Sequence, residues 1–144
     1  MFTGERRGVL LDTCFFLALQ NNDDVNHEKA IDLSERLASE GAVFWTTDYV
    51  LDEAITFAIR QTGSRKLAIE VAQLILAEDH VHLEWMNESR VRRSFAAFKK
   101  YDDKKFSFTD CSLIVLAQAE GFEWIVSFDE EFKKITDGPR VIDC

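Results

Sequence analysis

Acidic side chains stand after short apolar runs in this sequence, where buried strands are expected to end. Asp12 directly follows the run 9–11, and Asp129 comes shortly after the run 124–126. If these runs form parallel strands, their carboxyl ends meet at one edge of a sheet, and the two carboxylates lie near each other. Carboxylate oxygens are the ligands that hard divalent cations such as Mg²⁺ and Mn²⁺ prefer. The spacing therefore predicts a cation site at this edge, with the hydroxyl of Thr13 orienting Asp12.

A third acid, Asp110, lies on the apolar face of a predicted helix. It precedes Leu113, Ile114 and Ala117 by three, four and seven residues, so its side chain is expected to point toward the interior. A buried carboxylate is costly unless a donor or a cation neutralises it, which favours a metal ligand. The alternative is a capping box, because Ser107 stands three residues earlier.

Helix capping offers a structural interpretation of the other acids as well. Asp12 and Asp129 both stand where the N-cap of a helix is expected. A further acid is expected on the helix over about 47–61, where Asp52 and Glu53 border the two sides of the apolar stripe. Helical spacing alone does not choose between these two residues. At this point the residue types leave both the metal site and the caps open.

Short apolar runs alternate with longer stretches of helical periodicity along the chain. Strands are predicted at 9–11, 43–45, 81–85, 124–126 and 141–142. Helices are predicted from residue 15 onward, at 25–40, 47–61, 64–77, 89–100 and 107–120, with a short helical turn at 129–134. This alternation is typical of an α/β fold with a mostly parallel sheet that helices cover.

The chain has 144 residues, of which 47% are apolar, including 12 Phe and 3 Trp, which is enough for one domain with its own core. We therefore predict a single domain over 1–144. The cysteines show no spacing of a disulfide framework or a zinc site, and we expect Cys14 and Cys111 to be buried. No apolar run reaches the roughly 20 residues of a membrane span. No signal peptide is visible from 1–7 onward, so we expect a cytoplasmic protein.

The formal net charge of −9 argues against nucleic-acid binding, because contacts to phosphate need Lys and Arg. The basic residues are nevertheless clustered. Arg60, Arg65 and Lys66 form one group near Glu53, and we predict them as contacts to phosphate. A second group comprises Arg90, Arg92, Arg93, Lys99, Lys100, Lys104 and Lys105. Both groups are equally consistent with solvated helix faces.

Four segments of the sequence resemble the four motifs of the PIN-domain family, in that family's order. They are 9–14 (VLLDTC), 46–54 (TTDYVLDEA), 108–113 (FTDCSL) and 126–132 (VSFDEEF). The resemblance spans nearly the whole chain, and it places the family's acids at Asp12, Glu53, Asp110 and Asp129. One departure is Cys14, where a small polar residue is common and helps to orient the first acid.

The resemblance implies a PIN-like three-layer α/β sandwich, with a five-stranded, mostly parallel sheet flanked by helices. It also implies an endoribonuclease of the VapC type, which uses Mg²⁺ or Mn²⁺ to cleave single-stranded RNA and leaves 5′-phosphate and 3′-hydroxyl ends. Glu53 is preferred over Asp52 on this ground alone. The expected metal ligands and catalytic residues are Asp12, Glu53, Asp110 and Asp129, with Thr13 and Thr109 as hydrogen-bond donors to them.

The same resemblance implies a cognate antitoxin that covers the acidic pocket with a basic residue, and a homodimer. Two other classes stay open. One is a PIN fold that only binds RNA or protein, which the presence of all four acids disfavours. The other is a small receiver-like α/β module whose acids are helix caps. A receiver would carry adjacent acids after its first strand and a Lys after a late strand, and neither is evident.

Overall fold

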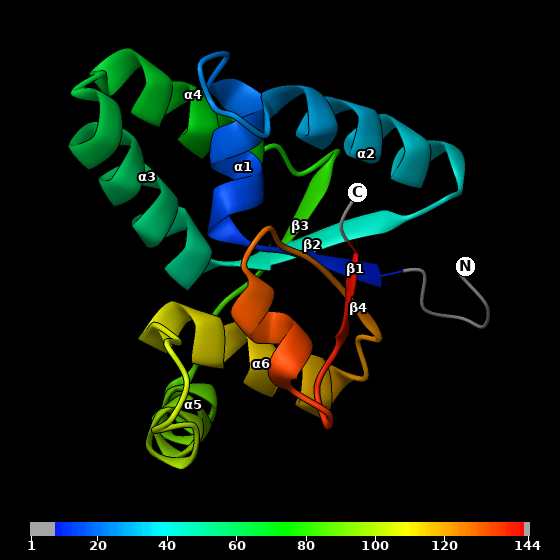
Figure 1. Cartoon of the computed structure of the whole chain (residues 1–144), viewed down its shortest axis with the longest axis vertical. Helices are drawn as coiled ribbons and strands as arrows, with labels where there is room; N and C mark the ends of the chain where they lie inside the picture. The colour runs from blue at the N-terminus through cyan, green and yellow to red at the C-terminus, as the bar shows by residue number, and fades with distance from the viewer. Residues whose placement is uncertain (1–7, 143–144) are drawn as a thin grey trace.

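The computed structural model describes residues 8–142, which are built around one sheet of five parallel strands (Figure 1). The strands are β1 (Gly8–Leu11), β2 (Val43–Thr47), β3 (Val81–Glu84), β4 (Trp124–Val126) and β5 (Arg140–Ile142). Every pair of neighbouring strands is parallel. The predicted α/β class and five-stranded sheet are confirmed. The prediction about a signal peptide at 1–7 falls on residues outside the described range.

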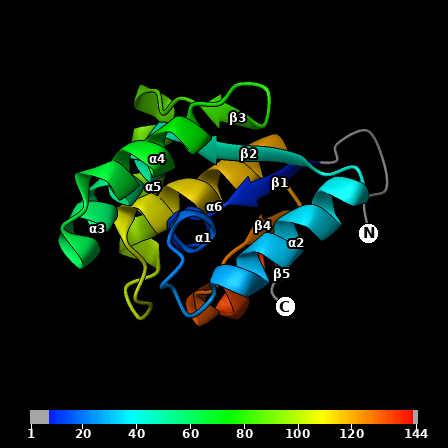
Figure 2. The ribbon, with the colours of Figure 1, turned by 90° about the horizontal axis from the view of Figure 1, so that it is seen from above.

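Helices cover both faces of this sheet. They are α1 (Thr13–Gln20), α2 (His27–Ser39), α3 (Asp48–Thr62), α4 (Arg65–Ile75), α5 (Glu88–Lys100) and α6 (Phe108–Glu120), followed by the 3₁₀ helix η1 (Glu130–Lys134). In Figure 1, α1, α2 and α4 lie on one side of the sheet, and α5 and α6 lie on the other. Seen from above, α1 is viewed along its axis between α2 and α4 (Figure 2). Within residues 8–142, no helix is both long and apolar enough to cross a bilayer.

β1 is the middle strand, and the strand order reverses there. The order across the sheet is β3-β2-β1-β4-β5, so the chain builds one side of β1 first and then crosses to the other side. The ladder continues past the end of β1, because the backbone N–H of Asp12 donates to the carbonyl of Val126 at 3.1 Å. Ligands bind beyond the carboxyl ends of strands at such a switch. The receiver-like alternative is wrong, because flavodoxin-like receivers have the order 2-1-3-4-5.

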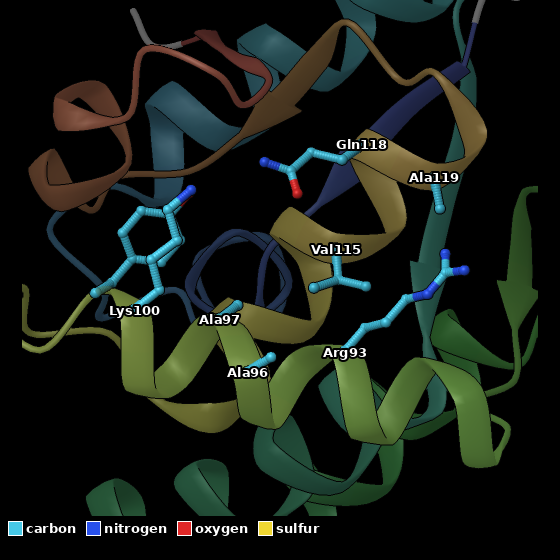
Figure 3. Close-up of a pocket in the computed structure, with 8 residues that line it drawn as sticks. Arg93, Ala96, Ala97, Lys100, Val115, Gln118 and Ala119 are labelled. Atoms are coloured by element: carbon cyan, nitrogen blue, oxygen red, sulfur yellow. The ribbon is translucent and has the colours of Figure 1, made fainter.

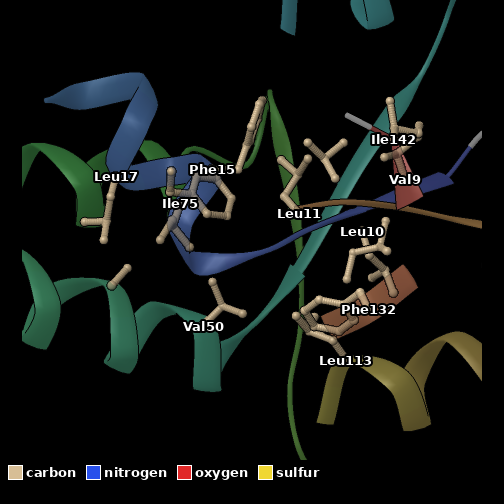
Figure 4. Close-up of a cluster of buried hydrophobic side chains, with 14 of the residues drawn as sticks. Val9, Leu10, Leu11, Phe15, Leu17, Val50, Ile75, Leu113, Phe132 and Ile142 are labelled. Atoms are coloured by element: carbon tan, nitrogen blue, oxygen red, sulfur yellow. The ribbon is translucent and has the colours of Figure 1, made fainter. Parts of the chain in front are cut away.

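The core lies on both faces of β1, which is buried along its whole length. Figure 4 shows Leu10 pointing toward Leu113 and Phe132 on one face, whereas Leu11 points toward the face covered by Phe15. Successive strand residues point to opposite faces, so an apolar run without alternation is what a doubly covered strand requires. The middle of α6 is enclosed, with every residue from Asp110 to Ala117 buried. This firm packing fixes the start of α6 relative to the end of β1.

The helix boundaries follow local capping chemistry. The side chain of Thr47 accepts a hydrogen bond from the N–H of Val50 and begins α3, and Gly63 ends that helix with φ +69°. Asn87 caps α5 two residues before the predicted start at residue 89. The helix predicted at 25–40 begins later, at His27, because Asp24 accepts a hydrogen bond from the N–H of Asn26 and holds a turn there.

Candidate metal centre

Three acids from distant parts of the sequence meet beyond the carboxyl end of β1. Asp12, Glu53 and Asp110 each offer a carboxylate oxygen, and these oxygens all lie within 4.8 Å of one another. Asp12 follows β1, Glu53 lies on α3 and Asp110 lies in the first turn of α6. Asp12 and Asp110 are only 4% and 8% exposed. The structure places Glu53 in this group, whereas its neighbour Asp52 is exposed.

The carboxylate of Asp12 is held by three donors. The backbone N–H of Thr13 donates to Oδ1 at 2.7 Å, and the hydroxyl of Ser127 donates to Oδ2 at 2.7 Å. The thiol of Cys14 adds a weaker bond to Oδ2 at 3.4 Å. Ser127 in turn accepts the N–H of Asp129 at 3.0 Å, which fixes its hydroxyl toward Asp12. The departure at Cys14 thus leaves Asp12 well oriented, because Ser127 supplies the strong hydrogen bond.

Ser127 did not figure in the sequence prediction, although its position could have suggested it. It is the first residue after β4, which pairs with β1, the strand that Asp12 follows. The predicted donor, the hydroxyl of Thr13, has no hydrogen-bond partner in the structure, and its oxygen is buried. Thr13 donates through its backbone instead. Thr109, the other predicted donor, accepts a hydrogen bond from Ser112 through its carbonyl at 2.6 Å.

Asp110 forms the predicted capping box and also belongs to the acidic cluster. It forms a capping box with Ser107: the N–H of Ser107 donates to Oδ2 at 2.8 Å, and the Ser107 hydroxyl accepts the N–H of Asp110 at 3.0 Å. The same hydroxyl lies 3.4 Å from Oε2 of Glu53 and donates to it. The cap therefore fixes the side chain of Asp110 and also links α6 to α3 at the acidic cluster.

Burial and mutual repulsion raise the pKa values of the two deeper acids. Removal from water raises the pKa of Asp110 to about 7, and the negative charges of Asp12 and Glu53 contribute. Burial likewise raises the pKa of Asp12, while its bonds to Ser127 and Thr13 oppose the shift. Around neutral pH the cluster therefore carries negative charge, which partial protonation of Asp110 reduces but does not remove.

The fourth predicted acid, Asp129, lies at the same cleft but outside the group of three. The cleft measures about 310 Å³, and both Asp24 and Asp129 line it beside the cluster. The carboxylate of Asp129 accepts the N–H of Glu131 at 3.0 Å and caps η1, as the capping interpretation predicted. In this structure the side chain of Asp129 caps η1, and the residue lines the wall of the cleft.

The basic residues lie mostly away from this cleft. Arg90 is held between Glu84 at 3.0 Å and Glu120 at 3.3 Å. A separate groove of about 400 Å³ lies between α5 and α6, and Arg93 and Lys100 are among the residues that line it (Figure 3). The predicted phosphate contacts, by contrast, do not line the acidic cleft; these are Arg60, Arg65 and Lys66.

The residues present fit a hard divalent cation. The donor set is three carboxylates, which is the chemistry that Mg²⁺ and Mn²⁺ prefer. Thr13 lines the same cleft, and its buried hydroxyl has no hydrogen-bond partner, so an additional polar group beside it would satisfy it. Bound positive charge would also offset the repulsion that raises the pKa of Asp110.

Comparison with known proteins agrees with this geometry. The family model described as PIN domain matches residues 9–138, so the chain belongs to the PIN domain family. A VapC ribonuclease from Aquifex aeolicus is 27% identical over 127 residues, which are 88% of this chain and 90% of that protein.

Two solved structures share the fold. One is VapC20 from Mycobacterium tuberculosis, described as a toxin that cleaves the sarcin-ricin loop. It has a TM-score of 0.77 and 24% identity and covers 88% of this chain and 93% of its own. The other is VapBC2 from Rickettsia felis, bound to a DNA fragment from its promoter. It has a TM-score of 0.69 and 13% identity and covers 94% of this chain and 97% of its own.

Proposed function

We propose that this PIN domain is a metal-dependent endoribonuclease that hydrolyses phosphodiester bonds of single-stranded RNA. The observation that carries the proposal is the convergence of Asp12, Glu53 and Asp110 within 4.8 Å at the point where the strand order reverses. The names of two relatives support it, because one is called a ribonuclease and the other a toxin that cleaves the sarcin-ricin loop.

All four predicted acids would take part in binding Mg²⁺ or Mn²⁺. Asp12, Glu53 and Asp110 would bind the cation directly, and Asp129 would contact it through water from the cleft wall. When bound, the cation supplies positive charge that attracts the scissile phosphate and makes water a stronger nucleophile at neutral pH. The hydrogen bond from Ser127 favours the ionised form of Asp12 and keeps it oriented.

We also infer that the chain is the toxin of a toxin–antitoxin pair. Support comes from the shared fold with VapC20 and VapBC2 and from the charge of the cleft. Five carboxylates line the cleft, so a partner segment that carries a basic side chain would complement it and exclude RNA. The homodimer expected from the resemblance stays a prediction, which light scattering on the purified protein would check.

A cleavage assay tests the nuclease directly. Labelled single-stranded RNA pools are incubated with Mn²⁺, Mg²⁺ or EDTA and with antitoxin-free wild type, Asp110→Asn, Glu53→Gln or Asp52→Asn. Asp52 provides a matched control, because it neighbours Glu53 on α3 but is exposed and outside the cluster. We expect metal-dependent cleavage by wild type and Asp52→Asn, and a loss of at least a hundredfold in the other two variants.

The opposite results have definite meanings. Full cleavage by Asp110→Asn or Glu53→Gln would overturn the assignment of the cluster. Cleavage in EDTA would overturn the role of the metal. A folded wild type that cleaves no RNA in any of the pools would favour the PIN fold as a binding module without catalysis.

A further inference from the structure

One basic side chain lines the acidic cleft within the described residues. Lys105 belongs to the lining, together with five carboxylates. It lies in the loop between α5 and α6, five residues before Asp110. An RNA phosphate that approaches the cleft meets a strongly negative surface, and the net charge of the chain is −9. A single positive charge beside this cleft therefore favours the binding of a phosphate there.

The ammonium of Lys105 is available, whereas those of its neighbours are engaged. Lys104 pairs with Asp103 at 2.9 Å, and Lys134 pairs with Glu131. Across residues 8–142, the side chain of Lys105 forms no ion pair, and it is exposed. Its charge helps to lower the pKa of Glu131, but that carboxylate is already paired with Lys134.

The backbone around Lys105 is anchored on both sides. Its own N–H donates to Oε2 of Glu131 at 3.3 Å, and Ser107, two residues later, caps α6 and donates to Glu53. The backbone that carries the side chain of Lys105 is therefore held in place. A residue that contacts substrate requires such a held position. Lys binds phosphate as a point charge, without the bidentate geometry of Arg.

We propose that Lys105 positions the RNA by binding a phosphate of the strand at the mouth of the acidic cleft. This inference rests on the proposed function. It adds a contact to those predicted from the sequence at Arg60, Arg65 and Lys66, which lie outside the cleft lining and stay a prediction. Lys105 is a positioning residue, since the cluster of acids would hold the reacting phosphate.

The test compares Lys105→Met, which keeps the length of the side chain and removes its charge, with Lys105→Arg. Lys99→Met is the matched control, because Lys99 lies over the ring of Phe95 on α5 and does not line the cleft. Steady-state cleavage of a labelled RNA is measured in Mn²⁺ at several salt concentrations. For Lys105→Met we expect KM to rise about tenfold at low salt with kcat nearly unchanged. The slope of log KM against log salt should fall by about 0.7.

A second readout separates a phosphate contact from a structural role. Lys105→Met should bind Mn²⁺ at least as tightly as wild type in calorimetry without RNA, because removal of a cation from an acidic cleft favours a second cation. Lys105→Arg should restore KM. If Lys105→Met binds Mn²⁺ more weakly than wild type, or has the same KM, the inference about Lys105 is wrong. The proposed nuclease function still stands in that case, provided that wild type cleaves the RNA. Absence of cleavage by wild type overturns the proposed function and this inference together.

Discussion

The protonation of Asp110 couples the cluster to pH. The pKa of Asp110 is about 7 in the folded protein, so the proton stays on up to that pH, whereas an Asp in the unfolded chain loses it near its ordinary pKa of 3.8. Between these values the metal-free folded state binds more protons than the unfolded state, so its free energy of unfolding falls as pH rises. Urea unfolding in EDTA at pH 5 and pH 7.5 should show a larger fall for wild type than for Asp110→Asn. An equal fall in both proteins would contradict the shift.

The same proton competes with the cation. Mn²⁺ has to displace it from Asp110, so the affinity should rise with pH up to about 7 and then level off. Calorimetric titrations with Mn²⁺ between pH 5.5 and 8 would measure this rise. An affinity that is flat across this range would mean that Asp110 is already ionised in the metal-free protein.

Ser127 gives a prediction about the orientation of Asp12. Ser127→Ala removes the 2.7 Å hydrogen bond to Oδ2, and we expect Mn²⁺ affinity and cleavage to fall at least tenfold. Ser94→Ala is the matched control, because Ser94 is equally buried but donates to the carbonyl of Arg90 on α5. Equal losses in the two variants would show that the effect of Ser127 is general destabilisation.

At the scale of elements, the cap of α6 serves both stability and the site. Ser107→Ala and Ser64→Ala each remove an N-cap hydroxyl, from α6 and α4 respectively, and each should lower the free energy of unfolding by about 1 kcal/mol. Only Ser107→Ala should also reduce cleavage, because Ser107 contacts Glu53 and Asp110. Urea unfolding and cleavage rates, measured together, check this. If Ser64→Ala also reduced cleavage, the loss of cleavage in both variants would be explained by lower stability alone.

The elements themselves were largely predictable from the sequence. Apolar runs bounded by Gly and by capping residues locate all five strands, and Thr47, Ser64 and Ser107 cap the helices where capping chemistry places them. The observed ends of helices differ from the predicted ones by a residue or two where a side chain hydrogen-bonds to the backbone, as Asn87 does at the start of α5. These signals are local, so a single sequence contains them.

The fine structure of the site was less predictable, because it depends on contacts between distant segments. Helical spacing could not separate Glu53 from Asp52, since the choice depends on how α3 docks beside α6. Ser127 and Lys105 become visible only when β4 and the α5–α6 loop are placed against the cluster. Periodicity identifies the buried face of an element, and it does not identify which neighbour that face meets.

At the scale of the whole molecule, the cluster predicts that a cation stabilises the fold. Repulsion among Asp12, Glu53 and Asp110 destabilises the metal-free protein, and a cation bound only by the folded state opposes unfolding. At a hundredfold excess over its dissociation constant, Mn²⁺ should raise the free energy of unfolding by about 2.7 kcal/mol. Thermal unfolding with Mn²⁺ or EDTA measures this, and the gain should be much smaller in Asp110→Asn. An equal gain in both proteins would place the cation elsewhere.

The wide separation of the clustered acids along the chain has a consequence for biosynthesis. Asp12 emerges from the ribosome early, whereas Asp110 follows long afterwards, and Ser127, which orients Asp12, comes later still. The central strand β1 also pairs with β4, so the sheet around the site closes only after residue 126 has been synthesised. A growing chain therefore has no assembled cluster until Asp110 has been synthesised, and Asp12 lacks its strongest side-chain donor until Ser127 follows. The proposed nuclease site is thus absent while the codons for these residues are still to be read.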